Sequence, residues 1–235
     1  MKKLALLLFG ISLYKDRKHW AYHTKVYSID WRLSYDNYQK YIIDFFRSKG
    51  FDIDIYLVSN TLEEADKQEL LEKWKPKAYD FLDVNNDYTC RCRQRNEKII
   101  RVIELCKKSL IQYDNILITR FDLKFKLPFD KLPLDYSMFN SAFYMTKMEM
   151  CDNFLFMDSK SLEVFYNATC DNMELMGHRL KLIIEKQQPI NYLFNVEDNT
   201  LKKSRYNYLY KNTLFDMIKL NNYTKNQILW KVVNN

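Results

Sequence analysis

Apolar residues follow two different periods along the first half of the chain, and the changes of period mark the expected elements. Continuous or alternating apolar runs are typical of strands, whereas apolar residues that recur every three to four positions are typical of helices. The expected strands are residues 3–9, 51–58, 78–84 and 116–125, and the expected helices are residues 34–50, 61–74 and 93–112. Residues 14–31 are polar and aromatic, and are expected to form a loop.

Short signals indicate where these helices begin and end. Ser34 is expected to be the N-cap of the first helix, and Gly50 is expected to end it. Thr61 and Glu64 have the spacing of a capping box, which predicts the start of the second helix. On the third helix the apolar positions expected to share one face are Ile99, Val102, Ile103, Cys106 and Leu110.

The alternation of strands and helices predicts a parallel sheet, because consecutive parallel strands need a crossover, usually a helix. The first strand is apolar throughout, so we expect it to be central and buried on both faces. In the second half the expected strands are residues 137–145, 153–157 and 190–194. One expected helix is capped by Ser159, and another covers residues 172–185. The predicted fold is α/β, with a mixed, mainly parallel sheet and helices on both faces. Without a repeat or a flexible linker, residues 1–235 are expected to form a single domain.

Composition narrows the classes of partner. The net charge of +7 favours anionic partners, but Lys and Arg alternate with Asp and Glu, so a nucleic-acid partner is disfavoured. The five cysteines are odd in number, and Cys90 and Cys92 lack a second pair at zinc spacing, which favours reduced thiols and a cytoplasmic location. The apolar opening lacks a signal-peptide cleavage site, and no segment is apolar enough to predict a transmembrane helix.

A polar pair interrupts the fourth expected strand. Arg120 and Asp122 flank Phe121 directly after four buried-type residues. Open α/β sheets bind ligands beyond the carboxyl ends of their strands, so this position predicts a site. The alternative is a salt bridge at the end of a strand, and the sequence leaves both possibilities open.

Three stretches of the chain carry a resemblance to a known class. They are Gly10 at the end of the first strand, the DIDIYLVSN stretch of residues 52–60, and the ITRFDLKF stretch of residues 118–125. With these stretches the chain resembles the GT-A class of nucleotide-sugar glycosyltransferases, in particular the small capsule-, lipopolysaccharide- and giant-virus-type transferases. The class's D-x-D signature is replaced here by Arg120-Phe121-Asp122, so one carboxylate remains.

The resemblance implies a GT-A-like, Rossmann-related fold, with a nucleotide-binding half at about residues 1–125 and an acceptor-side half at about residues 126–235. It implies a sugar donor linked to UDP or GDP, a glycan or glycoprotein acceptor, and Mn²⁺ or Mg²⁺ as the cofactor. Viral or bacterial glycan synthesis is the expected setting, in the host cytoplasm if the protein is viral.

Several residues are candidates for the donor site. The expected donor-binding residues are Gly10, Ser12, Asn60, Asp83, Arg95, Arg120 and Asp122. Glycine allows a ligand to approach the backbone closely, and arginine suits a diphosphate. Simpler explanations remain open: Gly10 as an ordinary turn, Asn60 as the approach to a helix, and Arg95 as part of a solvated run of arginines.

The remaining candidates concern the chemistry. Asp152 is the expected general base for the acceptor hydroxyl in an inverting reaction. Asp122 is the expected ligand of the divalent cation, and His178 is a second candidate ligand because it lies one helical turn from Glu174. A structural histidine is the alternative for His178. The competing functions are a catalytically inactive nucleotide- or sugar-binding protein and, less favoured, a nucleic-acid-binding protein.

Overall fold

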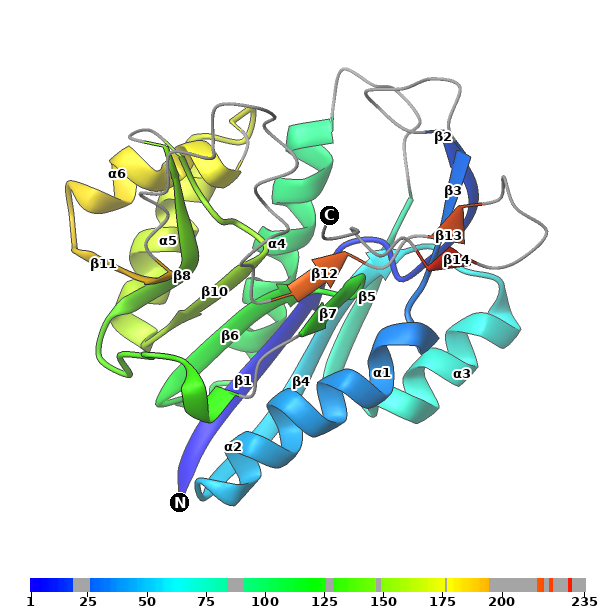
Figure 1. Cartoon of the computed structure of the whole chain (residues 1–235), viewed down its shortest axis with the longest axis horizontal. Coiled ribbons are helices and arrows are strands. Elements are labelled where there is room, and N and C mark those ends of the chain that lie inside the picture. The colour runs from blue at the N-terminus through cyan, green and yellow to red at the C-terminus, as the bar shows by residue number, and fades with distance from the viewer. Residues whose placement is uncertain are drawn as a thin grey trace.

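The computed structural model describes residues 1–18, 26–83, 91–125, 129–146, 149–175, 177–194, 215–217, 220–221 and 228–229. Within these residues a mixed β-sheet has the strand order β11-β8-β10-β6-β1-β4-β5, and β9 pairs with β8 (Figure 1). Its strands are β1 (Lys2–Phe9), β4 (Phe51–Asn60), β5 (Ala78–Leu82), β6 (Asn115–Arg120), β8 (Phe139–Thr146), β9 (Glu149–Met150), β10 (Phe154–Met157) and β11 (Ile190–Phe194).

Strand β1 lies at the centre of the parallel part of the sheet. It pairs in parallel with β4 on one side and with β6 on the other, and β4 pairs in parallel with β5. Only β10 runs against its neighbours β6 and β8 along this path, since β11 is parallel to β8. The prediction of a central first strand in a mixed, mainly parallel sheet is therefore confirmed.

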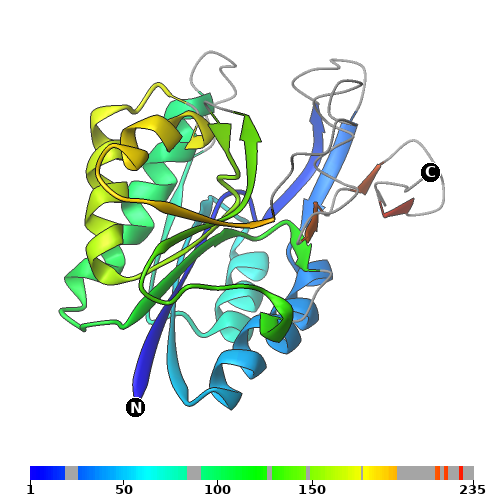
Figure 2. The ribbon, with the colours of Figure 1, turned by 60° about the vertical axis from the view of Figure 1, so that its left-hand side comes forward.

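Both faces of the sheet are covered by helices (Figure 2). Because side chains alternate along a strand, Leu4, Leu6 and Leu8 of β1 join a cluster on one face, whereas Ala5 and Leu7 join a cluster on the other. The first cluster includes residues of α1 (Arg32–Tyr38), α2 (Asp44–Ser48) and α3 (Glu64–Trp74). The second includes residues of α4 (Arg91–Lys108), α5 (Ser159–Asp171) and α6 (Lys181–Glu185).

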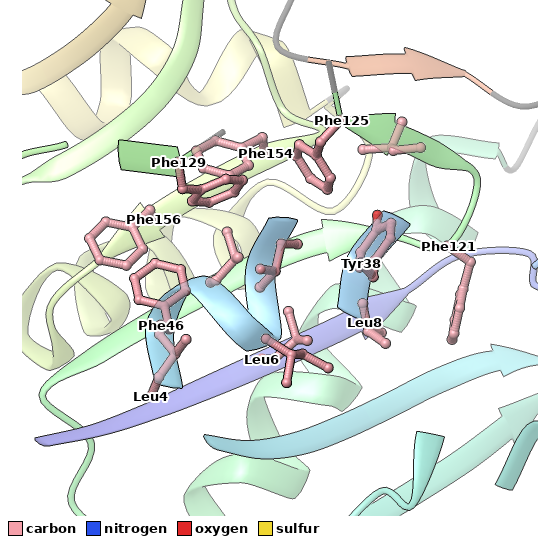
Figure 3. Packing of buried hydrophobic residues seen from close by; sticks show 14 of the residues in the cluster. Leu4, Leu6, Leu8, Tyr38, Phe46, Phe121, Phe125, Phe129, Phe154 and Phe156 are labelled. Atoms are coloured by element: carbon pink, nitrogen blue, oxygen red, sulfur yellow. The ribbon is translucent and has the colours of Figure 1, made fainter. Parts of the chain in front are cut away.

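Aromatic rings fill the space above β1 on the first face. Figure 3 shows Phe46 and Phe156 near Leu4, toward the start of β1, and Tyr38 and Phe121 toward its end, with Phe129 and Phe154 between them. The rings of Phe46 and Phe156 are stacked with centroids 5.7 Å apart, and most of the other pairs meet edge to face. These rings pack the first helical segment of the chain, α1 to α2, against β10.

The first helix begins before its expected N-cap. It runs from α1 through a π-helical segment, η1 (Gln39–Ile43), into α2, and Gly50 ends it with a φ of 81°, as predicted. The N-cap residue is Trp31, so the prediction that Ser34 caps the helix was wrong. The hydroxyl of Ser34 instead lies 2.6 Å from the carbonyl oxygen of Phe121.

Two other helix signals were also misassigned. The N-cap of α3 is Glu63, and the predicted capping box is absent because the Thr61 hydroxyl donates to Asp83 at 2.6 Å. Helix α4 ends at Lys108, and Leu110 is 93% exposed with a φ of 56°. The prediction that Leu110 belongs to the buried face was wrong because the chain turns into the left-handed region before reaching it.

The loop expected at residues 14–31 was wrong in its described part. Strands β2 (Leu13–Lys18) and β3 (Val26–Asp30) pair with each other and form a second sheet with β13 (Leu220–Asn221) and β14 (Ile228–Leu229). In addition, β7 (Leu123–Phe125) pairs with β12 (Phe215–Met217). These pairings join positions distant in sequence, which local periodicity does not reveal.

The second half is less helical than expected. The N-cap of α5 is Asp158, whose carboxylate accepts from the Ser161 amide, so Ser159 is the first helical residue and not the cap. The helix expected at residues 172–185 is reduced to η4 (Gly177–Leu180) and α6, and η3 (Phe129–Lys131) is a further short turn. The strand predictions for β8, β10 and β11 are confirmed. Within the described ranges, no helix combines the length and the apolar character needed to cross a membrane.

A partly buried polar network lies on the second face of the sheet. The hydroxyl of Tyr113 donates to the Asp54 carboxylate at 2.6 Å, and Lys77 lies 2.9 Å from the same oxygen. Tyr56 extends the network, with its hydroxyl 2.7 Å from that of Tyr113. Burial opposes the charge on Asp54, but the bonds from Tyr113 and Lys77 outweigh it and hold the pKa of Asp54 below its ordinary value.

We predict that replacing Leu110 with Gly stabilises the protein. A left-handed residue with an exposed side chain loses little packing, and removing its Cβ relieves strain, so the free energy of unfolding should rise by up to about 1 kcal/mol. The control is Leu182→Gly, where Leu182 is 40% exposed within α6 and the change should destabilise by about 1 kcal/mol. Urea denaturation measures the free energy of unfolding of both variants. A loss of stability in Leu110→Gly would contradict the proposed backbone strain at Leu110.

We also predict a pH-dependent contribution from Asp54. A carboxyl whose pKa is lowered on folding stabilises the protein above its unfolded pKa, and this contribution disappears as the pH falls through the folded pKa. Asp54→Asn should therefore be less stable than the wild type at pH 7, with the difference shrinking once the pH falls below the ordinary value of 3.8. Chemical denaturation across the acid range measures the difference, and a constant difference would exclude this linkage.

Candidate functional site

The order of the parallel strands reverses between β1 and β6. From β1 the chain reaches β4 and then β5 on one side, whereas α4 leads to β6 on the other side (Figure 1). In the register of the sheet, Phe9 stands opposite Val58 of β4 and opposite Arg120 of β6. Ligands of open α/β sheets bind at such a switch point, beyond the carboxyl ends of the strands. The candidate residues at these strand ends therefore meet at one edge.

The chain leaves β1 through Gly10. Gly10 has a φ of 116°, a conformation that side chains rarely permit, and its amide donates to the Val58 carbonyl oxygen at 3.2 Å. A Cβ at this position would find its nearest neighbour, Cγ of Arg120, at 4.0 Å. The backbone conformation and not crowding therefore explains the glycine, and its predicted contact with a ligand stays a prediction.

Ser12 and Asn60 come together, as expected for neighbouring strand ends. The Ser12 amide donates to Ser59 Oγ at 3.1 Å and to Asn60 Oδ1 at 3.2 Å, and the two serine hydroxyls are 2.6 Å apart. The Asn60 amide donates to the carbonyl oxygens of Leu13 and Thr61, both at 3.0 Å. These bonds fix the loop after β1, and the predicted donor contacts of Ser12 and Asn60 stay predictions.

Asp83 lies directly after β5, and β5 borders β4. Its carboxylate accepts from the Thr61 hydroxyl and thereby joins the ends of the two strands. β4 separates this contact from the reversal beside β1. The contact of Asp83 with a base stays a prediction.

Arg120 and Asp122 bind each other in a two-pronged ion pair. Nε of Arg120 donates to Oδ1 at 2.7 Å, and Nη2 donates to Oδ2 at 2.5 Å. The Asp122 side chain is 2% exposed, whereas that of Arg120 is 26% exposed. The salt bridge considered from the sequence is therefore present. It holds the Arg120 guanidinium at the edge of the sheet.

Helix α1 holds the turn that carries this pair. The side chain of Asn37 donates to the Phe125 carbonyl oxygen at 2.9 Å and accepts from the Phe125 amide at 2.6 Å. The Tyr38 hydroxyl donates to the Arg120 carbonyl oxygen, and the Ser34 contact with Phe121 completes the set. The sequence patterns did not reveal these contacts of Ser34, Asn37 and Tyr38. Polar side chains between apolar ones on a helix are a signal that could have indicated them.

Arg95 reaches the same edge from α4. Its Nη2 donates to the carbonyl oxygen of Asp152 at 2.7 Å and lies 3.0 Å from the Asp152 carboxylate, while its guanidinium lies 5.3 Å from the centre of the Phe9 ring. Burial lowers the pKa of the Arg95 guanidinium, and Asp152 opposes this effect whereas Arg120 adds to it. The Arg95 side chain is still 21% exposed, so it contacts solvent at one side.

Consecutive residues bind the two arginines. Arg95 binds Asp152, and Nη1 of Arg120 donates to Oδ1 of Asn153 at 3.3 Å. The Thr119 hydroxyl in turn donates to the Asn153 carbonyl oxygen at 3.1 Å, which fixes this segment to β6. The structure thus brings together three predicted residues, Arg95, Arg120 and Asp152, and adds Asn153, which sequence reasoning missed.

Other parts of the predicted site are not brought together. Glu174 lies in a turn and not on a helix with His178, and its carboxylate is 3.9 Å from Nη1 of Arg93. The side chain of His178 lies outside the described residues. Arg93 is 57% exposed and also binds Glu97, which fits the solvated-run explanation for that arginine alone.

The residues around Asp122 fit a resident divalent cation poorly. Both of its oxygens already accept hydrogen bonds from Arg120, and the side chain is nearly inaccessible. Among the residues that the structure describes, no group of three His, Cys, Asp or Glu side chains is placed to hold a metal. The metal roles of Asp122 and His178 therefore stay predictions.

Solved structures that are similar to this chain include the following two. The nucleoside-diphosphate-sugar pyrophosphorylase from Vibrio cholerae RC9 is 12% identical, with a TM-score of 0.48 over 82% of this chain and 92% of that chain. A glycosyltransferase involved in the glycosylation of the major capsid of PBCV-1 is 9% identical, with a TM-score of 0.40 over 83% of this chain and 81% of that chain. No protein-family model and no curated protein matches the sequence. At such low TM-scores these similarities do not assign a function to this chain.

We predict unequal effects from the two halves of the Arg120–Asp122 pair. Arg120→Met leaves the Asp122 carboxylate buried without its guanidinium partner, which should cost about 3–5 kcal/mol of unfolding free energy. Asp122→Asn should cost less, because Arg120 reaches solvent. The double variant should be more stable than Arg120→Met alone, since no buried charge remains. Denaturant titration of the three variants measures this order, and equal single effects would contradict it.

Proposed function

We propose that the protein is a glycosyltransferase that moves a sugar from a nucleoside diphosphate sugar to a hydroxyl group of a glycan or glycoprotein. The observation that carries this proposal is the convergence of Arg95 and Arg120 at the switch point of the sheet. Two guanidinium groups held at a strand-end edge suit a diphosphate, because each matches phosphate oxygens with paired donors. The resemblance of the ITRFDLKF stretch to R-x-D-L transferases points to the same donor.

In the proposed reaction, negative charge develops on the leaving diphosphate, next to the two arginines. The bond between the sugar's anomeric carbon and the diphosphate breaks, and the nucleoside diphosphate leaves with the electron pair. A new bond forms between that carbon and the acceptor oxygen. Fixed cations stabilise the charge that develops on the leaving diphosphate without any reorganisation at the moment of reaction. Arg95 and Arg120 have this role in the proposal, with the nucleoside toward Gly10 and Ser12.

The acceptor hydroxyl must lose a proton, and Asp152 is the proposed base in an inverting reaction. Its carboxylate lies 3.0 Å from Arg95 and is 15% exposed. A base beside the diphosphate-binding arginine is close to the reacting carbon, which is where the acceptor oxygen attacks. The proposal assigns no step to a metal ion, since the residues at Asp122 fit one poorly.

A second candidate function is supported by the same ion pairs. Asp152 is bound by Arg95 and Asp122 is bound by Arg120, so both carboxylates already have cationic partners. A protein that binds the nucleotide sugar without transferring the sugar would keep this arrangement. Release of UDP or GDP from the donor, with and without an acceptor, separates the two functions, because only the enzyme produces it.

We predict that the protein binds UDP or GDP and that the two arginines account for much of the affinity. Hydrogen bonds to charged groups contribute about 1.5–3 kcal/mol each, and about 1.4 kcal/mol is a factor of ten in affinity. Arg95→Met and Arg120→Met should therefore each weaken diphosphate binding at least about tenfold, while binding of the free nucleoside changes little. Isothermal titration calorimetry measures both ligands, in the presence and absence of Mn²⁺.

The matched control is Arg93→Met. Arg93 lies on the same helix, but its side chain is 57% exposed and bound to Glu97. Its replacement should leave nucleotide affinity unchanged. Binding of neither UDP nor GDP under any metal condition would rule out the proposed function. If binding requires Mn²⁺ and Asp122→Asn abolishes this Mn²⁺-dependent binding, the result supports the metal role predicted for Asp122.

A further inference from the structure

Gly177 lies against the end of the Arg95 side chain. A Cβ added to Gly177 would lie 2.3 Å from Nη1, 2.8 Å from Cζ and 2.9 Å from Nη2 of Arg95. Real Cβ atoms do not approach other atoms this closely, so the guanidinium occupies the space that any other side chain at position 177 would need. Gly177 is itself buried at the start of η4.

The guanidinium of Arg95 is not free to move aside. Nη2 is bound to the carbonyl oxygen and the carboxylate of Asp152, and Nη1 donates to Oδ1 of Asn96 at 3.2 Å. The Phe9 ring of β1 lies 5.3 Å from its centre. One side of the Arg95 side chain reaches solvent, but moving the guanidinium away from position 177 would break these bonds. A side chain at position 177 would therefore displace the guanidinium from Asp152.

Asn96 fastens the turn that precedes Gly177. It is fully buried, and its side-chain amide donates to the carbonyl oxygens of Met173 and Leu175, both at 2.8 Å. The same side chain accepts from Arg95, its neighbour on α4. Asn96 thus holds the backbone of the turn and the guanidinium in one network, and a buried amide with all of these bonds has little freedom.

We infer that Gly177 and Asn96 are positioning residues for donor binding, because they set where the Arg95 guanidinium meets the diphosphate. The inference rests on the proposed function and extends it to two residues, Gly177 and Asn96, that were not among the candidates from the sequence. Neither residue needs to touch the ligand. The glycine provides the space, and the asparagine keeps the turn at the correct distance from α4.

The first test is Gly177→Ala, with inorganic pyrophosphate, UDP and uridine as probes in calorimetry. Displacing the guanidinium should weaken binding of pyrophosphate and of UDP by about tenfold, the size of one lost charge-assisted bond. Uridine affinity should be unchanged, because Arg95 faces the diphosphate. A residue with a merely structural role would weaken all three ligands together or none. Asn96→Ala should give the same pattern.

The second test is a double-mutant cycle with Arg95→Met. A methionine lacks the terminal atoms that conflict with a Cβ at position 177, so Gly177→Ala should have no further effect on pyrophosphate binding in that background. The same cycle measured on unfolding free energy keeps the proposal testable if Gly177→Ala folds poorly, since Arg95→Met should then restore much of the lost stability.

The control is Gly50→Ala, which introduces strain at a φ of 81° where a Cβ would find no atom within 4 Å. It should lower stability and leave all three affinities unchanged. Tight pyrophosphate binding by Gly177→Ala, or a further loss in the Arg95→Met background, would overturn the inference while the proposed function stands. A wild-type protein that binds no diphosphate would overturn both.

Discussion

The parallel pairing of β1 with both β4 and β6 is the constraint on which the rest of the structure depends. It buries the apolar side chains of β1 against helices on both faces, and it places Phe9 opposite Arg120 at one edge. Parallel strands expose their carboxyl ends on the same side, so polar residues distant in sequence meet there. Arg120 and Asp122, at the junction of β6 and β7, lie at that edge.

Polar groups near this edge are held by specific partners and not by solvent. Asp122 is almost inaccessible and is bound by Arg120, and the side-chain amide of Asn60 binds both the loop after β1 and Thr61. Unsatisfied buried polar groups are expensive, so such networks persist only when their members are matched. The consequence is an Arg120 guanidinium whose direction is set in advance, which in the proposed function would cost a bound diphosphate little reorganisation.

The second half of the chain contributes residues to the proposed donor site. Asp152 and Asn153 bind the two arginines, and Gly177 leaves room for one of them. The position of Arg95 therefore depends on residues that follow it by more than fifty positions in the sequence. In the proposed function, the segments around Asp152 and Gly177 therefore help to place the arginine that binds the diphosphate.

Apart from β2 and β3, the sequence by itself determined the strands and helices of the first half, because their apolar periods report burial directly and the continuous apolar run of residues 4–9 indicates a central strand. It also indicated that Arg120 and Asp122 end a buried strand. Only the tertiary structure decided that the two form a closed ion pair, since the turn at residues 121–122 and the burial of Asp122 bring their side chains together. The same holds for Ser34, which resembles a cap in sequence but binds a distant carbonyl, and for Gly177. Local patterns report which face is buried, whereas hydrogen-bond partners far apart along the chain are set by packing.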